Sequence, residues 1–335
     1  MILILLFAAQ LISFDLFIKL FAFSYPFIAV ILLAYLLYTK QIHFNFKLSK
    51  VTRRFSGSIL KLSSFVYAAL VVFNISIVFD SLLISSVMKD ALAQLAVYSV
   101  AQNIAAMIQA PQRGIISASM IHLATAWKEK NMEMIRKIYQ RSSINQLLFA
   151  CGFFSLVVLN LQDAVVTFEL KDTYLKAFYV VIFLGMAKLV DMGTGVNAQI
   201  IATSTYWRFE LFSGIILLSV MLPLSYILTR EYGIVGTAVA QLISISIYNL
   251  IRVLFLWNKF RLQPFSRQTV YTILLGAACF ALSYWLFMDL HSWTGLFARS
   301  IFFCVVFAGG AIYMNLSPDI QPVLKNLKSR IGWKS

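Results

Sequence analysis

The chain has 335 residues, of which 61% are hydrophobic and only 12% are charged, and its mean hydropathy is +0.83. This composition excludes an ordinary soluble domain and is typical of a protein with many membrane-spanning helices. The net charge of +15 does not indicate a nucleic-acid partner, because the basic residues are spread between apolar stretches.

Residues that could support catalysis or hold a cofactor are sparse. Cys151, Cys279 and Cys304 all lie in apolar segments, and the three histidines are scattered along the chain. No GxxxxGK[ST] motif, no Ser–His–Asp arrangement and no close pair of carboxylates at membrane depth can be assembled. The sequence therefore predicts a protein that is not an enzyme, with no metal site and no cofactor.

Ten stretches are long and apolar enough to cross a bilayer, which takes roughly 17–25 residues. They are approximately 1–16, 18–39, 62–86, 95–121, 143–161, 173–204, 205–229, 232–257, 267–288 and 296–315. The first is the weakest, since it begins apolar at Met1 and stops at Asp15, like a helix whose beginning is missing. We therefore expect an all-α polytopic membrane protein with about ten transmembrane helices.

The loops between these stretches alternate in charge. Most of the 28 Lys and Arg residues fall in the second, fourth, sixth and eighth connections and in the C-terminal tail. Because basic loops stay on the cytoplasmic side, both termini are predicted to be cytoplasmic. The stretch 122–142 has helical spacing, so it is either a helix along the membrane surface or a solvated loop.

The stretch 173–204 has charges near its middle. Lys188 and Asp191 lie three residues apart, so on a helix they share a face and can pair, and Asn197 extends the polarity. A charge at this depth costs at least a few kcal/mol unless it faces protein, water or a partner. Two interpretations stay open: a pair that locks two helices together, or the wall of a water-filled substrate pathway.

Other polar residues lie inside the spans. Gln109 and Arg113 share one helical face, and Pro111 between them predicts a kink, because proline removes a backbone donor. Asp80 either pairs with Arg113 or Lys188 or lies at the outer membrane interface. The small residues Gly233, Gly236 and Ala240 are more typical of close helix packing than of chemistry.

Three segments resemble a known family. They are YGIVGTAVA at 232–240, followed by a helix that ends in basic residues, AVYSVAQNIAAMIQAPQRGIISASMIHLATAWKEKN at 96–131, and IRKIYQRSS at 135–143. Together they resemble polysaccharide-export flippases, the lipopolysaccharide and O-antigen branch of the multidrug/oligosaccharidyl-lipid/polysaccharide exporter superfamily. The resemblance covers most of the chain from about residue 60 onward.

The resemblance implies two six-helix lobes around a central cavity, often with two further helices. This chain then holds part of that pattern, with about four N-terminal helices missing and the second lobe MATE-like. The parts are the last two helices of the first lobe at 1–39, a basic cytoplasmic linker at 40–61, the second lobe at 62–257, two additional helices at 258–315 and a basic cytoplasmic tail at 316–335.

The resemblance also implies a function. Such proteins move undecaprenyl-diphosphate-linked glycans across the bacterial inner membrane by alternating access, in contact with membrane lipids and alongside other polysaccharide-assembly membrane proteins. Arg113 and Lys188 then face the diphosphate in a cavity with Gln109 and Asn197. Asp191 or Asp80 holds the lysine in the absence of substrate, or binds a coupling proton or sodium ion.

Three alternatives stay open. A multidrug exporter of the same superfamily favours acidic cavity residues, whereas the buried residues here include basic ones. A membrane glycan polymerase or transferase usually needs a sizeable outer loop or a soluble domain, and the predicted outer loops are short. A remnant that does not transport but assembles with other membrane subunits is the third.

Overall fold

The computed structural model describes residues 6–7, 11–42, 49–169, 175, 177–290 and 292–322. All regular secondary structure in these residues is helical, which confirms the all-α fold class. The chain forms two compact units, Met1–Leu62 and Ser63–Ser335. Half of the predicted first span, residues 43–48 of the predicted linker and most of the predicted tail lie outside the described residues.

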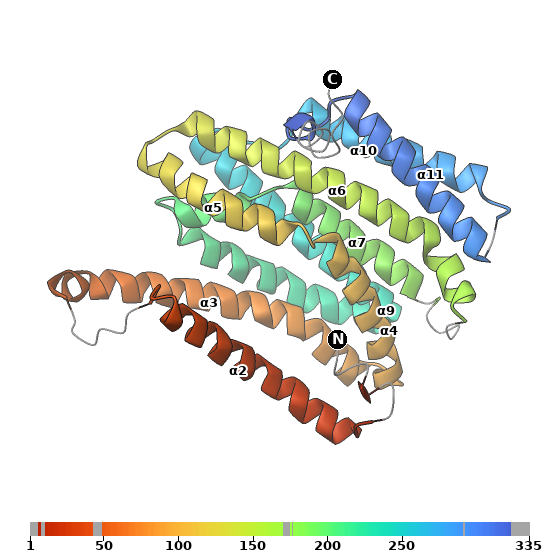
Figure 1. The fold of residues 1–335 in the computed structure, drawn as a ribbon, viewed down its shortest axis with the longest axis horizontal. Coiled ribbons are helices and arrows are strands. Elements are labelled where there is room, and N and C mark those ends of the chain that lie inside the picture. The colour runs from red at the N-terminus through yellow and green to blue at the C-terminus, as the bar shows by residue number, and fades with distance from the viewer. Residues whose placement is uncertain are drawn as a thin grey trace. The chain divides into compact units, whose positions relative to one another are not determined.

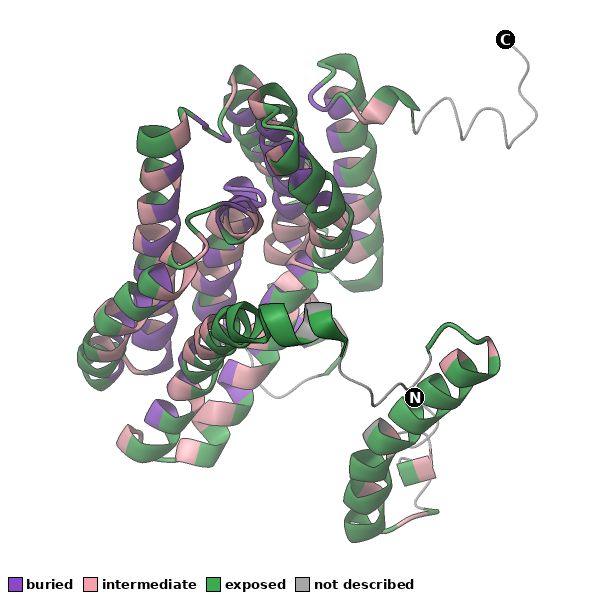
Figure 2. Cartoon of the chain, turned by 90° about the vertical axis from the view of Figure 1, so that its left-hand side faces the viewer, coloured by how far each residue is buried: buried purple, intermediate pink, exposed green. Residues whose placement is uncertain are grey.

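The first unit contains α2, Phe14–Tyr38, which matches the predicted span 18–39. Ser13 caps its N-terminus by accepting from the Leu16 amide at 3.4 Å. Almost every described side chain of α2 is exposed although the helix is strongly apolar (Figure 2). An exposed apolar helix of this length is suited to a lipid environment rather than to water.

The second unit contains the remaining helices (Figure 1). They are α3 (Lys50–Val87, which begins in the first unit), α4 (Ala91–Ile108), α5 (Gln112–Lys128), α6 (Met132–Thr167), α7 (Ala177–Gly193), α8 (Asn197–Thr203), α9 (Phe209–Phe260), α10 (Arg267–Leu286) and α11 (Ser292–Tyr313). By length and apolarity, 7 helices of the described chain can cross a membrane, or up to 8 if α7 and α8 form one span bent by 45°. Since α9 covers two predicted spans, this number is consistent with the expectation.

The long helix α9 is a helical hairpin that turns at Gly233, where φ is +63°. Near the turn, the hydroxyls of Thr229 and Thr237 lie 2.8 Å apart, and at the other end Arg252 bonds Glu210. These contacts show that the halves 209–232 and 234–260 run antiparallel, as the separate predictions for 205–229 and 232–257 require.

Close packing at this turn depends on glycine. A Cβ atom added to Gly236 would lie 1.9 Å from the carbonyl oxygen of Leu228, closer than any real contact. Because that atom belongs to the backbone, it cannot move aside as a flexible side chain would. The predicted packing role of the small residues is therefore confirmed at Gly236.

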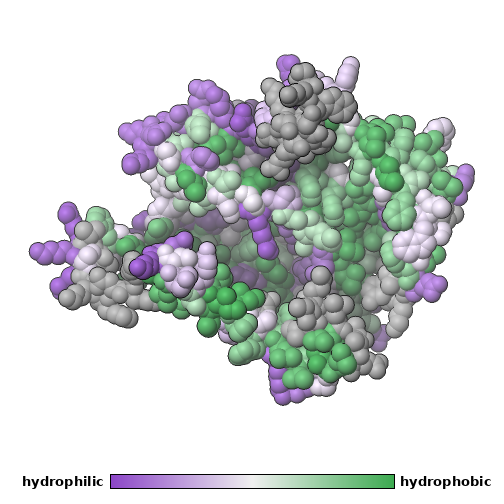
Figure 3. Space-filling view, in the orientation of Figure 1, coloured by the Kyte–Doolittle hydropathy of each residue, from purple (hydrophilic) through white to green (hydrophobic). Residues whose placement is uncertain are grey.

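The helices of the structure differ from the predicted spans at two places. The predicted span 95–121 is broken at 109–111, where Pro111 precedes α5, which confirms the predicted kink. The stretch 122–142, predicted as a surface helix or a loop, is helical on both sides of a short turn, where α5 ends and α6 begins, so the loop alternative is wrong. Asn131 ends the turn by accepting from the Met134 amide at 2.9 Å. Hydrophilic residues gather at this end of the unit (Figure 3).

The core lies between α4, α6, α7 and α9, and α10 and α11 cover α6. Arg299 lies within the predicted span 296–315 and is buried in α11. It donates to the Leu159 carbonyl at 2.7 Å and pairs with Asp163 of α6 at 2.8 Å. This arginine thus ties the α10–α11 hairpin to the rest of the bundle.

Candidate functional site

The polar interior of the second unit centres on the break between α7 and α8. Gly195 in the break has φ +64°, a conformation that L side chains rarely adopt. Ser143 of α6 donates to the Gly193 carbonyl at 2.5 Å, and the Val196 amide donates to Ser142 at 3.3 Å. Side chains of α6 therefore satisfy backbone groups that the break releases, as irregular backbone in a membrane interior requires.

Asp191, in the last turn of α7, is surrounded by neutral amide donors from three places. Gln109 and Gln112, on either side of Pro111, donate to its Oδ2 at 3.0 and 3.1 Å. Asn249 of α9 donates to its Oδ1 at 3.2 Å. One half-buried carboxylate thus joins the break between α4 and α5 to the break between α7 and α8.

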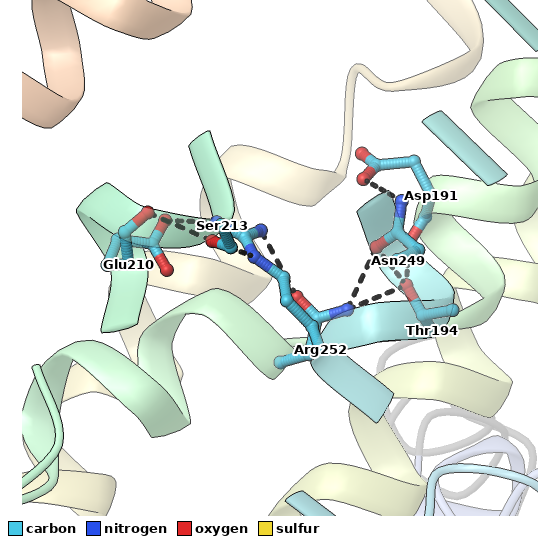
Figure 4. Close-up of polar contacts among 7 residues, drawn as sticks. Asp191, Thr194, Glu210, Ser213, Asn249 and Arg252 are labelled. Atoms are coloured by element: carbon cyan, nitrogen blue, oxygen red, sulfur yellow. Dashed lines mark hydrogen bonds and ion pairs between the residues drawn. The ribbon is translucent and has the colours of Figure 1, made fainter. Parts of the chain in front are cut away.

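A second set of polar groups continues from Asn249 (Figure 4). Its Oδ1 accepts from Asn197 at 2.9 Å and from Thr194 at 2.8 Å, and Asn197 also donates to the Thr194 hydroxyl at 3.0 Å. All three side chains are at most 5% exposed. Because each amide both donates and accepts here, the chain of hydrogen bonds fixes the orientation of the break relative to α9.

Arg252 of α9 lies at the other end of this set. Its side chain is only 5% exposed, and it pairs with Glu210 in the first turn of the same helical hairpin. It also donates to Ser213 at 3.3 Å and to Asn197 at 3.5 Å, and its guanidinium carbon lies 3.8 Å from the centre of the Tyr248 ring. One connected network therefore runs from Glu210 to Asp191 (Figure 4).

The residues predicted to form the site are distributed as follows. Gln109, Asp191 and Asn197 belong to the network. Two interpretations were open for Lys188 and Asp191: within the described chain they form no ion pair at contact distance, since Asp191 is turned toward the amides, although its charge still acts on Lys188. Lys188 is half-buried, one turn before Asp191. Arg113 is exposed in the first turn of α5, next to Gln112.

Asp80 belongs to a separate cluster and is 1% exposed. Tyr98 of α4 donates to its Oδ2 at 2.9 Å, and Ser225 of α9 lies 3.4 Å from its Oδ1. The described residues place no lysine or arginine in ion-pair contact with it, so the suggested pairing with Arg113 or Lys188 does not occur. Its carboxylate is buried between α3, α4 and α9.

Several network residues were missed from the sequence, chiefly Gln112, Asn249 and Glu210. Gln112 lies beside the proline that predicts the kink, and Asn249 precedes Arg252 by three residues on one helical face. An acidic residue at the start of an apolar span, as Glu210 is, signals a need for a partner. These signals could have singled out the three residues as candidates for polar contacts. They could not have shown which residues contact each other.

No known family model matches the chain, and no curated protein matches it. Its structure is similar to that of the lipid II flippase MurJ in an inward closed conformation, with a TM-score of 0.60, 14% sequence identity and coverage of 82% of this chain and 57% of that one. It shares the MurJ fold.

Two further solved structures match more weakly. One is an outward-facing multidrug resistance MATE family transporter of the MOP superfamily, with a TM-score of 0.49, 14% identity and coverage of 76% of this chain and 64% of that one. The other is a MOP superfamily transporter from Pyrococcus furiosus, with a TM-score of 0.46, 15% identity and coverage of 75% and 61%. This chain therefore spans less than two thirds of the length of each.

Proposed function

We propose that the chain belongs to the multidrug/oligosaccharidyl-lipid/polysaccharide exporter superfamily. We infer that it moves a lipid-linked oligosaccharide, carried on undecaprenyl diphosphate, across the bacterial inner membrane for polysaccharide or O-antigen lipopolysaccharide biosynthesis. The fold shared with a lipid II flippase supports a lipid-linked substrate. Both termini are cytoplasmic in this proposal, the second lobe spans 62–257, and other polysaccharide-assembly membrane proteins act alongside.

The observation on which this rests is the charge balance around the broken helices. Lys188 is half-buried, and no carboxylate of the described chain forms an ion pair with it or with Arg113. Asp191, the nearest carboxylate in the sequence, is occupied by three amides. A diphosphate needs compensating cations to enter a membrane interior, and a lysine and an arginine without direct ion-pair contacts suit it better than they suit a cationic drug.

Reconstitution tests this function directly. The protein is placed in liposomes that contain an undecaprenyl-diphosphate-linked glycan. The binding of an added lectin measures how much of the glycan is exposed on the outer leaflet. We expect protein-dependent exposure of the glycan and no transport of ethidium. Ethidium transport without glycan movement would support the multidrug alternative and contradict the proposal.

We also propose that Asp80 binds the coupling cation, a proton or a sodium ion. Its carboxylate is buried with only hydroxyl partners, so its charge needs a bound proton or metal cation for balance. Tyr98 and Ser225 come from α4 and α9, so occupancy of this site affects the packing of both helices on α3.

Asp80→Asn should abolish the acceleration of glycan flipping by an imposed proton or sodium gradient, while the slow rate without a gradient persists. Asparagine keeps the size; its oxygen can accept from one hydroxyl and its amide can donate to the other, but the titratable charge is removed. The liposome assay with and without each gradient measures this. Asp90→Asn, at an exposed turn before α4, is the matched control. Gradient-driven flipping by Asp80→Asn would rule out this role.

A further inference from the structure

A hollow of about 500 Å³ lies where the chain passes from α8 into α9. It is lined by residues 205–209 together with Phe212 and Phe255, and most of the lining side chains are aromatic. It lies at the same end of the unit as the α5–α6 turn, because one hydrophobic cluster joins Trp127, Phe209, Phe255 and Phe260. The aromatic residues that line this hollow do not belong to the polar network that runs from Glu210 to Asp191.

Contacts between rings hold these walls in place. Phe209 stacks on Phe255 with ring centres 3.8 Å apart, and the edge of Tyr206 meets Phe255 at 5.7 Å and Phe260 at 5.8 Å. Trp207 meets the ring of Phe65 in α3 at 5.2 Å, with the ring planes at 89°. Because these rings hold one another in position without a ligand, less binding free energy is spent on ordering the side chains when a ligand binds.

Two exposed cations lie on these rings. The guanidinium carbon of Arg208 is 5.2 Å from the Trp207 ring centre and 5.9 Å from that of Phe65, and the Lys259 ammonium is 5.6 Å from the Tyr206 ring centre. Within the described chain no carboxylate forms an ion pair with either. Glu210, two residues after Arg208, is engaged by Arg252.

We propose that this hollow binds the phosphate headgroup of an anionic phospholipid. Arg208 and Lys259 supply the positive charge, and the aromatic rings match the amphipathic level between headgroups and acyl chains. The exposed apolar side chains of Phe212, Ile215 and Ile216 continue from the hollow along α9 and offer a surface for an acyl chain. A soluble anion would satisfy the two cations but would leave this apolar surface uncovered.

This inference is independent of the transported substrate. The protein in detergent micelles is titrated with phosphatidylglycerol that has brominated acyl chains, and quenching of tryptophan fluorescence reports binding through Trp207. Brominated phosphatidylcholine supplies the zwitterionic reference. We expect wild-type protein to prefer the anionic lipid, and Arg208→Ala/Lys259→Ala to lose about tenfold in affinity for it. Loss of Trp207 quenching in Trp207→Phe would assign the signal to the hollow.

The control is Lys128→Ala/Lys130→Ala, which removes the same charge from exposed positions at the same end of the unit. This variant should retain the preference for phosphatidylglycerol. Equal losses in both double variants would show diffuse attraction rather than a site and would overturn the proposal, as would unchanged binding by Arg208→Ala/Lys259→Ala. Displacement of the lipid by inorganic phosphate alone would equally overturn it, because the site would then recognise the anion without its acyl chain.

Discussion

Replacing Lys188 by methionine should slow the flipping of a diphosphate-linked glycan about ten- to a hundredfold without lowering the amount of protein in the membrane. A charge-assisted hydrogen bond to a phosphate contributes about 1.5–3 kcal/mol, which corresponds to that loss. Abundance should hold because Asp191, whose charge acts on Lys188, keeps its three amide donors when the lysine is removed. Flipping per unit of protein in liposomes and immunoblots of membranes provide the two measurements.

Comparison variants separate substrate binding from structural support. Lys188→Arg keeps the charge and should retain part of the activity. Arg113→Ala should act in the same direction, and Arg113→Lys should be partly tolerated, since an ammonium cannot reproduce the two parallel donors of a guanidinium. Asp191→Asn should instead lower abundance, because it sets an amide donor against those of Gln109 and Gln112. Normal flipping by both Lys188→Met and Arg113→Ala would remove these cations from the substrate path.

The positions of the helices followed from the sequence because they depend on local properties. Apolar length defined the spans, and the backbone demand of Pro111 predicted one interruption; Gly233 was assigned only to packing, and the structure shows that it forms a turn. Pro111 cannot donate the hydrogen bond that a continuous helix needs, and Gly233 adopts a positive φ at the turn of α9. Asn131 could have corrected the prediction for 122–142, since asparagine favours the position before a helix.

The contacts of the site did not follow from the sequence, because they depend on how helices far apart in the chain pack. The spacing of Lys188 and Asp191 permits a pair, yet it also permits Asp191 to turn toward other helices. Amides of Gln109 and Asn249 approach it from positions 82 and 58 residues away. Three neutral donors satisfy the carboxylate, so Lys188 acts on it through its charge and not through a direct contact. Periodicity shows which residues share a face but not which faces meet.

Breaking the ion pair between Glu210 and Arg252 should have the largest effect on stability. The Arg252 side chain is 5% exposed and that of Glu210 25%, and removing one partner of such a pair costs about 3–5 kcal/mol because the other charge stays buried. Glu210→Gln and Arg252→Met should therefore each sharply reduce membrane abundance and lower the melting temperature in detergent. The double variant Glu210→Leu/Arg252→Met should recover much of the loss, since no lone charge remains. Glu133→Gln breaks an exposed pair with Lys137 and should change little. If Glu210→Gln were as stable as that control, the pair would not hold the two ends of the α9 hairpin together.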